Sequence, residues 1–229
     1  MSDYIKINGV SSETLNLWAD TPPVPSMAKQ KYTSWVNASD EGGTTADDTF
    51  EDITLNFDLY SFFDENYDNT AVYQYFSNAQ TLEFSRHEGF YYKIKQVSVT
   101  CEGQYDGNRI KYRASFKLSP FRYAVDNPEI EVTSGDVIEN SGSRYSRPVY
   151  TLTGSGTATI IVNGETFTIN DLSGTVVIDC TRMVVYDPTS GDNLLPKTSG
   201  KLPFLAVGNN VIVYTNVTSL TLRKNERWY

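Results

Sequence analysis

The sequence has little of what most catalytic and metal sites need. It contains one histidine, His87, and two cysteines, Cys101 and Cys180, which lie far apart and form no Cys-x-x-Cys pair. Neither a disulfide framework nor a zinc knuckle is supported, and we expect two buried free thiols in a reducing compartment. His87 lies two residues before Gly89 in a turn-like stretch, where we expect an exposed turn residue.

The common hydrolase and nucleotide-binding motifs are also missing. Gly154-Ser155-Gly156 leads into a strand pattern, so it predicts a turn and not a phosphate-binding loop. The stretch 64–68 fits the first positions of a calcium loop, but Asn69 and Tyr75 stand where that loop needs glycine and glutamate. We expect no cofactor, no metal and no catalysis. A hydrolase that uses two of the 28 acidic residues stays open as a hypothesis without specific support.

Basic residues are too few for a protein that grips nucleic acid. The 19 Lys and Arg residues face 28 Asp and Glu residues, which gives a net charge of −9 and an isoelectric point near 4.6. This charge repels phosphates. Long hydrophobic runs are absent as well, since runs such as Val211-Ile212-Val213 have only strand length, and the N-terminus shows no signal pattern. We expect synthesis in a cytoplasm, with no signal peptide and no membrane contact.

Aromatic residues and alternating patterns are plentiful, and they indicate β-strands. The 16 Tyr, 11 Phe and 3 Trp residues favour sheets. Residues 53–59 alternate strictly between apolar and polar side chains, which predicts a half-buried strand. Asn8-Gly9 and Asn163-Gly164 predict tight turns. Residues 70–79 have helical spacing and predict one short helix, whereas residues 37–49 predict a long loop or a hairpin arm.

A domain boundary is expected where proline interrupts the strands. We expect the ladder to break at Ser119-Pro120, because proline donates no amide hydrogen, and Asn127-Pro128 repeats the interruption. This predicts domains at residues 1–126 and 127–229. The second half shows only short strand patterns parted by Gly, Asn and Asp. The fold class is therefore mainly β: an N-terminal β-sandwich-like domain with one short helix and an extended arm, then a C-terminal antiparallel β-sandwich.

Two sets of side chains are candidates for function. From Tyr32 to Ser85 there are eleven acidic residues and no Lys or Arg. They form either a solvated face or a surface that repels a polyanion such as DNA. Tyrosines of the second domain either pack in the core and rim or stack on sugar rings. The channel or arm candidates are Asp40, Glu41, Asp47, Asp48, Glu51 and Asp52, and the glycan-stacking candidates are Tyr145, Tyr150, Tyr186 and Tyr214.

The order and spacing of several motifs resemble the distal tail protein family of long-tailed phages and prophages. The resemblance runs nearly end to end, and no single motif decides it. In the first half it rests on residues 5–9, 53–59 and 91–93 and on Phe116 to Tyr123. In the second half it rests on residues 140–142, 147–150, 154–156, 163–164, 177–179, 186–187, 203–205 and 208–210 and on the terminal Arg227-Trp228-Tyr229.

The resemblance implies a structural protein of the virion tail, at the tail tip or baseplate. Its first domain would form a ring, usually a hexamer, around a channel through which DNA passes without specific binding, and its second would be a galectin-like sandwich. The implied partners are other copies of the chain, the major tail tube protein, a tail-tip or tail-associated protein and receptor-binding proteins. The family's arm often carries a Gly-Arg-x-Gly element, but residues 37–43 contain no arginine. The alternative from another class is a carbohydrate-binding module that acts in adhesion to the host surface.

Overall fold

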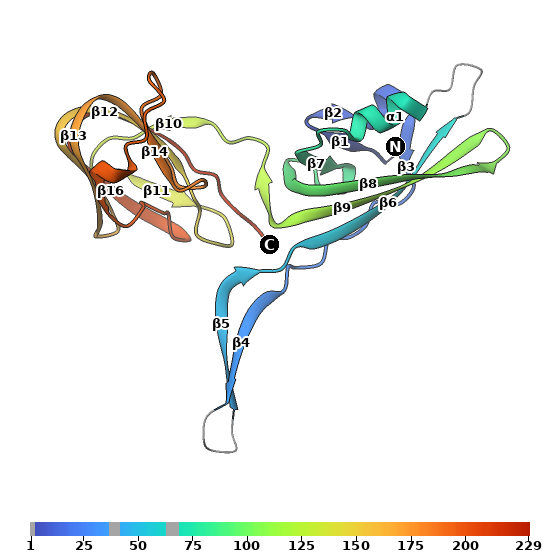
Figure 1. Ribbon diagram of the computed structural model, residues 1–229, viewed down its shortest axis with the longest axis horizontal. Coiled ribbons are helices and arrows are strands. Elements are labelled where there is room, and N and C mark those ends of the chain that lie inside the picture. Colours follow the sequence, from blue (N-terminus) through green and yellow to red (C-terminus); the bar gives the residue numbers. More distant parts are fainter. Residues whose placement is uncertain (1–2, 37–41, 63–68) are drawn as a thin grey trace. The chain divides into compact units, whose positions relative to one another are not determined.

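The computed structural model describes residues 3–36, 42–62 and 69–229, and it is built mainly from β-strands (Figure 1). The chain divides into two compact units. Unit 1 comprises Met1–Arg122 together with Tyr229, and unit 2 comprises Tyr123–Trp228. The mainly β fold class predicted from the sequence is confirmed.

Unit 1 is built on a seven-stranded sheet with the order β2-β1-β7-β8-β9-β6-β3. Its strands are β1 (Ile5–Ile7), β2 (Val10–Ser11), β3 (Leu17–Ala19), β6 (Ile53–Phe62), β7 (Thr81–Phe84), β8 (Phe90–Asp106) and β9 (Arg109–Ala124). The connections include the 3-10 turns η1 (Ser12–Leu15) and η2 (Ser85–His87) and the helix α1 (Asn69–Phe76). The short helix and the tight turn at Asn8-Gly9, which joins β1 to β2, are confirmed.

The alternation in β6 and β9 produces the core of unit 1. Leu55 and Phe57 face inward on β6, and they pair with the buried Phe116 and Ala114 of β9. The Phe57 ring lies 5.5 Å from the ring of Phe84 and 5.6 Å from that of Phe116, both edge-to-face. Such contacts add to the burial of apolar area. The polar residues between them stay on the opposite face of the sheet.

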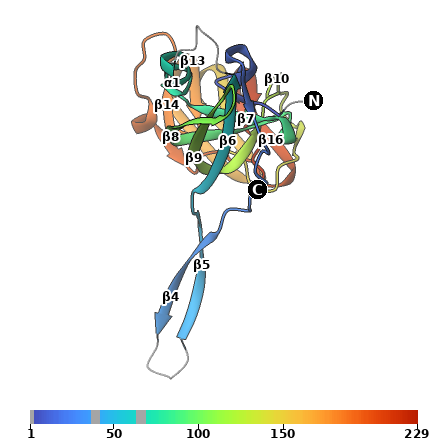
Figure 2. The ribbon, with the colours of Figure 1, turned by 90° about the vertical axis from the view of Figure 1, so that its right-hand side faces the viewer.

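A hairpin leaves this sheet. Strands β4 (Gln30–Val36) and β5 (Gly42–Phe50) pair antiparallel from Gln30↔Phe50 to Val36↔Gly42. They form a separate two-stranded sheet that extends away from the rest of unit 1 (Figures 1 and 2). Residues 37–49 were expected to form either a long loop or a hairpin arm. Their described part, residues 42–49, belongs to a hairpin arm.

Unit 2 has three long strands at its centre. The order is β10-β16-β12-β13-β14, with β11 pairing to β16 and β15 to β13. The strands are β10 (Glu129–Glu131), β11 (Val137–Asn140), β12 (Val149–Val162), β13 (Glu165–Asp179), β14 (Val184–Tyr186), β15 (Thr198–Gly200) and β16 (Gly208–Arg223), with the 3-10 turn η3 (Leu195–Lys197) before β15. The hairpin at Asn163-Gly164 is confirmed, with both residues at positive φ.

The long strands correct two expectations. The short strand patterns on the two sides of Gly154-Ser155-Gly156 belong to one strand, β12, and these three residues form an irregular bend within it rather than a turn. A Cβ on Gly154 would lie 2.3 Å from the Asn216 carbonyl oxygen, so the bend needs glycine there. Likewise β9 does not end at Pro120 but runs to Ala124. Its pairing with β6 stops at Leu118, so β6 requires no amide hydrogen from Pro120.

Two buried asparagines hold the loop before β16. The Asn210 side chain donates to the carbonyls of Ala206 (2.9 Å) and Gly208 (2.7 Å) and accepts from the Ala206 amide (2.7 Å). Asn140 donates to the carbonyls of Leu205 and Ala206 and accepts from the Gly142 amide. Asn140 joins the loop to the end of β11, 65 residues earlier in the chain, and Asn210 joins two backbone groups of the loop itself, so the loop is fixed against the sheet.

Candidate functional site in the arm and sheet of unit 1

The arm is anchored at its base and open along both edges. Phe50 packs on the core of unit 1, with its ring 5.2 Å from that of Phe121. The Glu51 amide donates to the Lys29 carbonyl (2.9 Å), which closes the base. In the described part of the chain, no further strand pairs with β4 or β5. A lone two-stranded hairpin is marginal in water and offers unpaired N–H and C=O groups, so the arm can pair with another chain.

The acidic candidates occupy different environments. Asp40 and Glu41 lie outside the described residues. Asp47 lies on β5, where both carboxylate oxygens are 3.1 Å from the Thr33 hydroxyl. Asp48 lies on the same strand. Glu51 is exposed in the link from β5 to β6.

Asp52, by contrast, is paired with lysines. Lys95 of β8 hydrogen-bonds to its Oδ1, and the Lys117 Nζ of β9 lies 3.6 Å from Oδ2. The hydrogen bond from Lys95 is the main reason that the pKa of Asp52 lies below its usual value. One carboxylate therefore meets two ammonium groups, and this site carries no surplus of negative charge.

A second network lies further along the same face of the sheet. Asp58 of β6 accepts from Lys111 (3.0 Å) and Arg113 (3.2 Å) of β9, and both cations also reach Glu102 of β8 (3.4 and 3.2 Å). Burial raises the pKa of Asp58, but the two hydrogen bonds outweigh it, so that pKa is lowered. Thr21, Asp58 and Arg113 line part of a hollow of about 500 Å³ beside this network.

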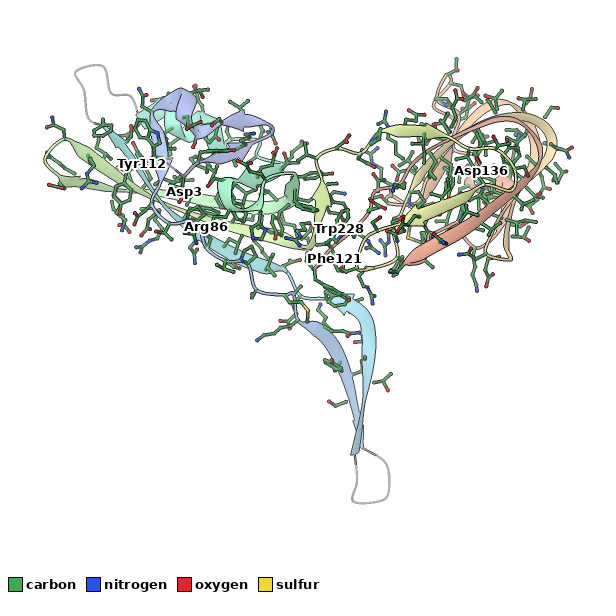
Figure 3. The ribbon with its side chains drawn as sticks, turned by 180° about the vertical axis from the view of Figure 1, so that it is seen from behind. Asp3, Arg86, Tyr112, Phe121, Asp136 and Trp228 are labelled. Carbon is green, nitrogen blue, oxygen red and sulfur yellow. The ribbon has the colours of Figure 1, made fainter. Side chains whose placement is uncertain are left out.

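These networks explain a charge pattern that spans two consecutive stretches of the sequence. The acidic stretch from Tyr32 to Ser85 is followed, from Arg86 to Arg122, by eight basic and three acidic residues. Antiparallel pairing places β6 beside β9, so carboxylates of the first stretch meet cations of the second. The signal that could have shown this was the basic excess in residues 86–122. On this face of the unit 1 sheet, the carboxylates of Asp52, Asp58 and Glu102 are therefore neutralised by lysine and arginine side chains. Figure 3 labels Tyr112 in the first half and Phe121 in the second half of β9.

The four tyrosines of unit 2 are not gathered into one site. Tyr150 is fully buried, and its hydroxyl donates to the Pro203 carbonyl (2.8 Å). The Tyr214 hydroxyl donates to the Val132 carbonyl (3.2 Å). Tyr186 is half-buried at the edge strand β14.

The ring of Tyr145 is covered by side chains of its own unit. The Arg227 guanidinium carbon lies 4.4 Å from its centre, and the Phe204 ring lies 5.6 Å away. Tyr150 is therefore a core residue, and the Tyr145 face is already occupied by a cation, so neither ring is free for stacking on a sugar.

The described residues also bear on metal, membrane and ligand sites. Within residues 3–36, 42–62 and 69–229, no three metal-ligating side chains form a group that could hold an ion. No helix in the described residues is long and apolar enough to cross a membrane. Unit 2 has a cleft of about 420 Å³, lined by residues that include Asp126, Ile138, Glu139 and Lys224.

The fold, a mainly β unit that carries an arm followed by a second β unit, is shared with solved structures of phage tail proteins. Over 100% of both chains, this chain is similar to the Dit protein of phage SPP1, described as a paradigm of the hub of the adsorption apparatus in phages that infect Gram-positive bacteria. The TM-score is 0.67 and the sequence identity is 14%.

Two further solved structures share this fold. A chain of the phage P2 baseplate in its activated conformation with calcium has a TM-score of 0.52 at 12% identity, over 97% of both chains. The same baseplate with strontium gives 0.52 and 12%, over 97% of this chain and 96% of the other. No family model matches the chain, and no curated protein is similar to it in sequence. At the level of the fold, the resemblance stated from the motifs is confirmed.

Proposed function

We propose that this chain is a non-enzymatic structural hub of a phage or prophage tail. The observation that carries the proposal is the fold match over the whole of both chains with the hub protein of phage SPP1. In this role the protein resides in the virion tail, joins the tail tube protein to a tail-tip protein and supports receptor-binding proteins at its rim. DNA passes it without being bound.

The arm supports self-assembly into a closed ring. Its two strands have seven and nine residues, and the described chain leaves their outer edges unpaired. The edges of the main sheet are much shorter, since β2 has two residues and β3 has three. Unpaired long edges favour strand addition from a neighbour, and a head-to-tail contact between unlike surfaces closes into a ring. The ring is most simply a hexamer, with unit 1 at its centre and the galectin-like unit 2 outside.

Removal of the arm tests this assembly. Gln30 and Phe50 are paired at the base of the hairpin, so two glycines in place of residues 31–49 can close it as a tight turn. We expect the shortened chain to keep its circular dichroism spectrum and to be monomeric by light scattering, whereas the full chain is oligomeric. Equal oligomer masses for the two chains would overturn the role of the arm.

The acidic residues of the arm have a further proposed role in the channel. In a ring they multiply into a negative lumen that repels DNA and prevents adhesion. Asp40, Glu41, Asp47 and Asp48 carry this proposal, together with Glu51, whereas Asp52 is neutralised by its two lysines.

Charge removal in a phage tests the lumen. We expect D40N/E41Q/D47N/D48N to slow DNA ejection. The matched control, D126N/E131Q/E139Q/D171N, removes four exposed charges from unit 2 and should leave ejection unchanged. Equal rates of DNA ejection for both quadruple variants would contradict the proposed role of the acidic residues in the channel.

The carbohydrate-binding alternative has less support. It requires exposed aromatic rings on unit 2, but Tyr150 is buried and the Tyr145 ring is covered. No described feature favours a hydrolase over a structural role.

A further inference from the structure

The single histidine of the chain, His87, is hydrogen-bonded to Arg122 near the end of β9. His87 closes η2, and its ring lies 5.0 Å from that of Phe84. Its Nδ1 lies 3.1 Å from Arg122 Nη1. The Arg122 guanidinium also stacks over the Phe90 ring, with its carbon 4.6 Å from the ring centre. His87 is therefore half-buried and bonded, and the expectation of an exposed turn residue is wrong.

The chemistry of the two groups fixes the proton on the imidazole. A guanidinium has only donors, so Nδ1 must accept the hydrogen bond. An imidazole that accepts through Nδ1 is neutral and carries its proton on Nε2. Burial and the positive charge of Arg122 both hold the pKa of His87 below its usual value, so this neutral form prevails at pH 7.

The other charged groups around His87 are held by partners of their own or point to solvent. On its own segment, Arg86 is exposed and Glu88 accepts from the Tyr4 hydroxyl (2.9 Å). Asp3 accepts from the hydroxyl of Ser85 (2.6 Å). On β8, the Tyr92 phenol interacts with the Arg122 guanidinium. The group that faces the imidazole from β9 is thus a cation.

Arg122 lies beyond the part of β9 that is hydrogen-bonded to β6. The pairing of β9 with β6 stops at Leu118, and Pro120 has no amide hydrogen to donate. Arg122 is also the last residue of unit 1 before the chain enters unit 2 at Tyr123. Side-chain contacts of Arg122 therefore fix the end of β9 more than they would fix a strand that is paired throughout.

We propose that His87 and Arg122 form a proton-controlled clamp on the end of β9, where the chain leaves unit 1. When His87 is neutral, Nδ1 accepts from Arg122 and the end of β9 is held. When His87 takes a proton from the solvent, Nδ1 becomes a donor that faces a donor, and two positive charges lie about 3 Å apart. The hydrogen bond then breaks, and Arg122 and the residues after it are released.

The test follows His87 and the end of β9 in the full chain. Because there is one histidine, a sample with ¹³C-labelled histidine gives one imidazole signal across a pH titration. We expect the Nε2–H tautomer at pH 7 and a pKa below 6.5 that rises toward 6.5 in R122Q, while the exposed neighbour variant R86Q titrates like the wild type. A wild-type pKa at or above 6.5, or an equal response of R122Q and R86Q, would overturn the clamp. Figure 3 labels the neighbours Arg86 and Phe121.

Amide hydrogen exchange tests the release itself. We expect residues 122–124 to lose protection as the pH falls through the pKa of His87, after correction for intrinsic exchange. In H87Q the amide oxygen can accept from Arg122 at every pH, so protection should stay constant. Loss of protection in H87Q equal to that in the wild type would show that acid acts elsewhere, and would refute the proposal.

Discussion

The buried amide of Asn210 is predicted to be one of the main supports of unit 2, and Asn210→Ala removes it. The side chain is fully buried and donates to the carbonyls of Ala206 and Gly208, while its oxygen accepts from the Ala206 amide and from the Asn163 side chain, each within 2.9 Å. Truncation leaves several of these groups without a partner. Each orphaned buried group costs about 1–3 kcal/mol.

The expected loss for Asn210→Ala is smaller than the sum over all four groups. The partners are only partly buried, and water can enter the space that the side chain leaves, so we expect a loss of about 2–4 kcal/mol in the free energy of unfolding. Asn209→Ala is the matched control, because Asn209 is the adjacent residue of the same type and is exposed. It should change the stability by less than about 0.5 kcal/mol.

The assay is urea unfolding followed by hydrogen exchange, which reports unit 2 separately from unit 1. Asn210→Ala should lower the protection of β12, β13 and β16 and leave β6 and β9 unchanged. A free energy of unfolding within about 1 kcal/mol of Asn209→Ala would refute the reasoning that this network supports the loop.

Three further predictions concern a glycine, a carboxylate and a phenol. Gly154→Ala should destabilise unit 2 by about 1–3 kcal/mol in thermal unfolding, because its Cβ would lie 2.3 Å from the Asn216 carbonyl oxygen; an unchanged melting temperature would count against the bend. The folded pKa of Asp52 lies below its usual 3.8, so its pairing stabilises the protein above pH 4 and this contribution is lost as the pH falls through the folded pKa. In Asp52→Asn, the free energy of unfolding should therefore fall less steeply than in the wild type as the pH is lowered below about 4. An unchanged slope would contradict the pairing. Tyr150→Phe removes the hydrogen bond to Pro203 and should cost about 1 kcal/mol in urea unfolding, with a gain in stability as the contrary result.

Local signals predicted several elements of unit 1 and one hairpin turn of unit 2. The period of two from Ile53 to Leu59 identified β6, and three-and-four spacing identified α1, because both patterns follow directly from which side chains face the core. Asn-Gly pairs gave the turns at Asn8 and Asn163 for the same local reason, since both residues adopt positive φ there.

Where a strand ends depends on its pairing with distant strands, and here the local signals predicted the strand ends incorrectly. Gly154 and Pro120 looked like interruptions, yet β12 bends at the first and β9 continues through the second. Whether a breaker ends a strand depends on the partner opposite it, which a single sequence does not show. The sequence likewise gave no means of pairing Asp52 with Lys95, or His87 with Arg122, because these partners lie 43 and 35 residues apart.

The candidate site was predicted only in outline. The acidic stretch and the arm were found from composition, but the division of its acidic residues into arm residues and sheet residues required the register of β6 against β9. The tyrosines were named because aromatic rings can stack on sugars, and only the fold places Tyr150 in the core. Burial of a tyrosine on an alternating strand depends on which face meets the core, and the sequence of unit 2 did not fix that face.

The solution mass of the full chain shows whether it assembles into the ring that we propose. Light scattering of the full chain over a concentration series, with negative-stain microscopy of the largest species, measures both mass and shape. We expect a closed ring with an open centre and a mass that is an integer multiple of 25.7 kDa. A mass of 25.7 kDa at every concentration would contradict it.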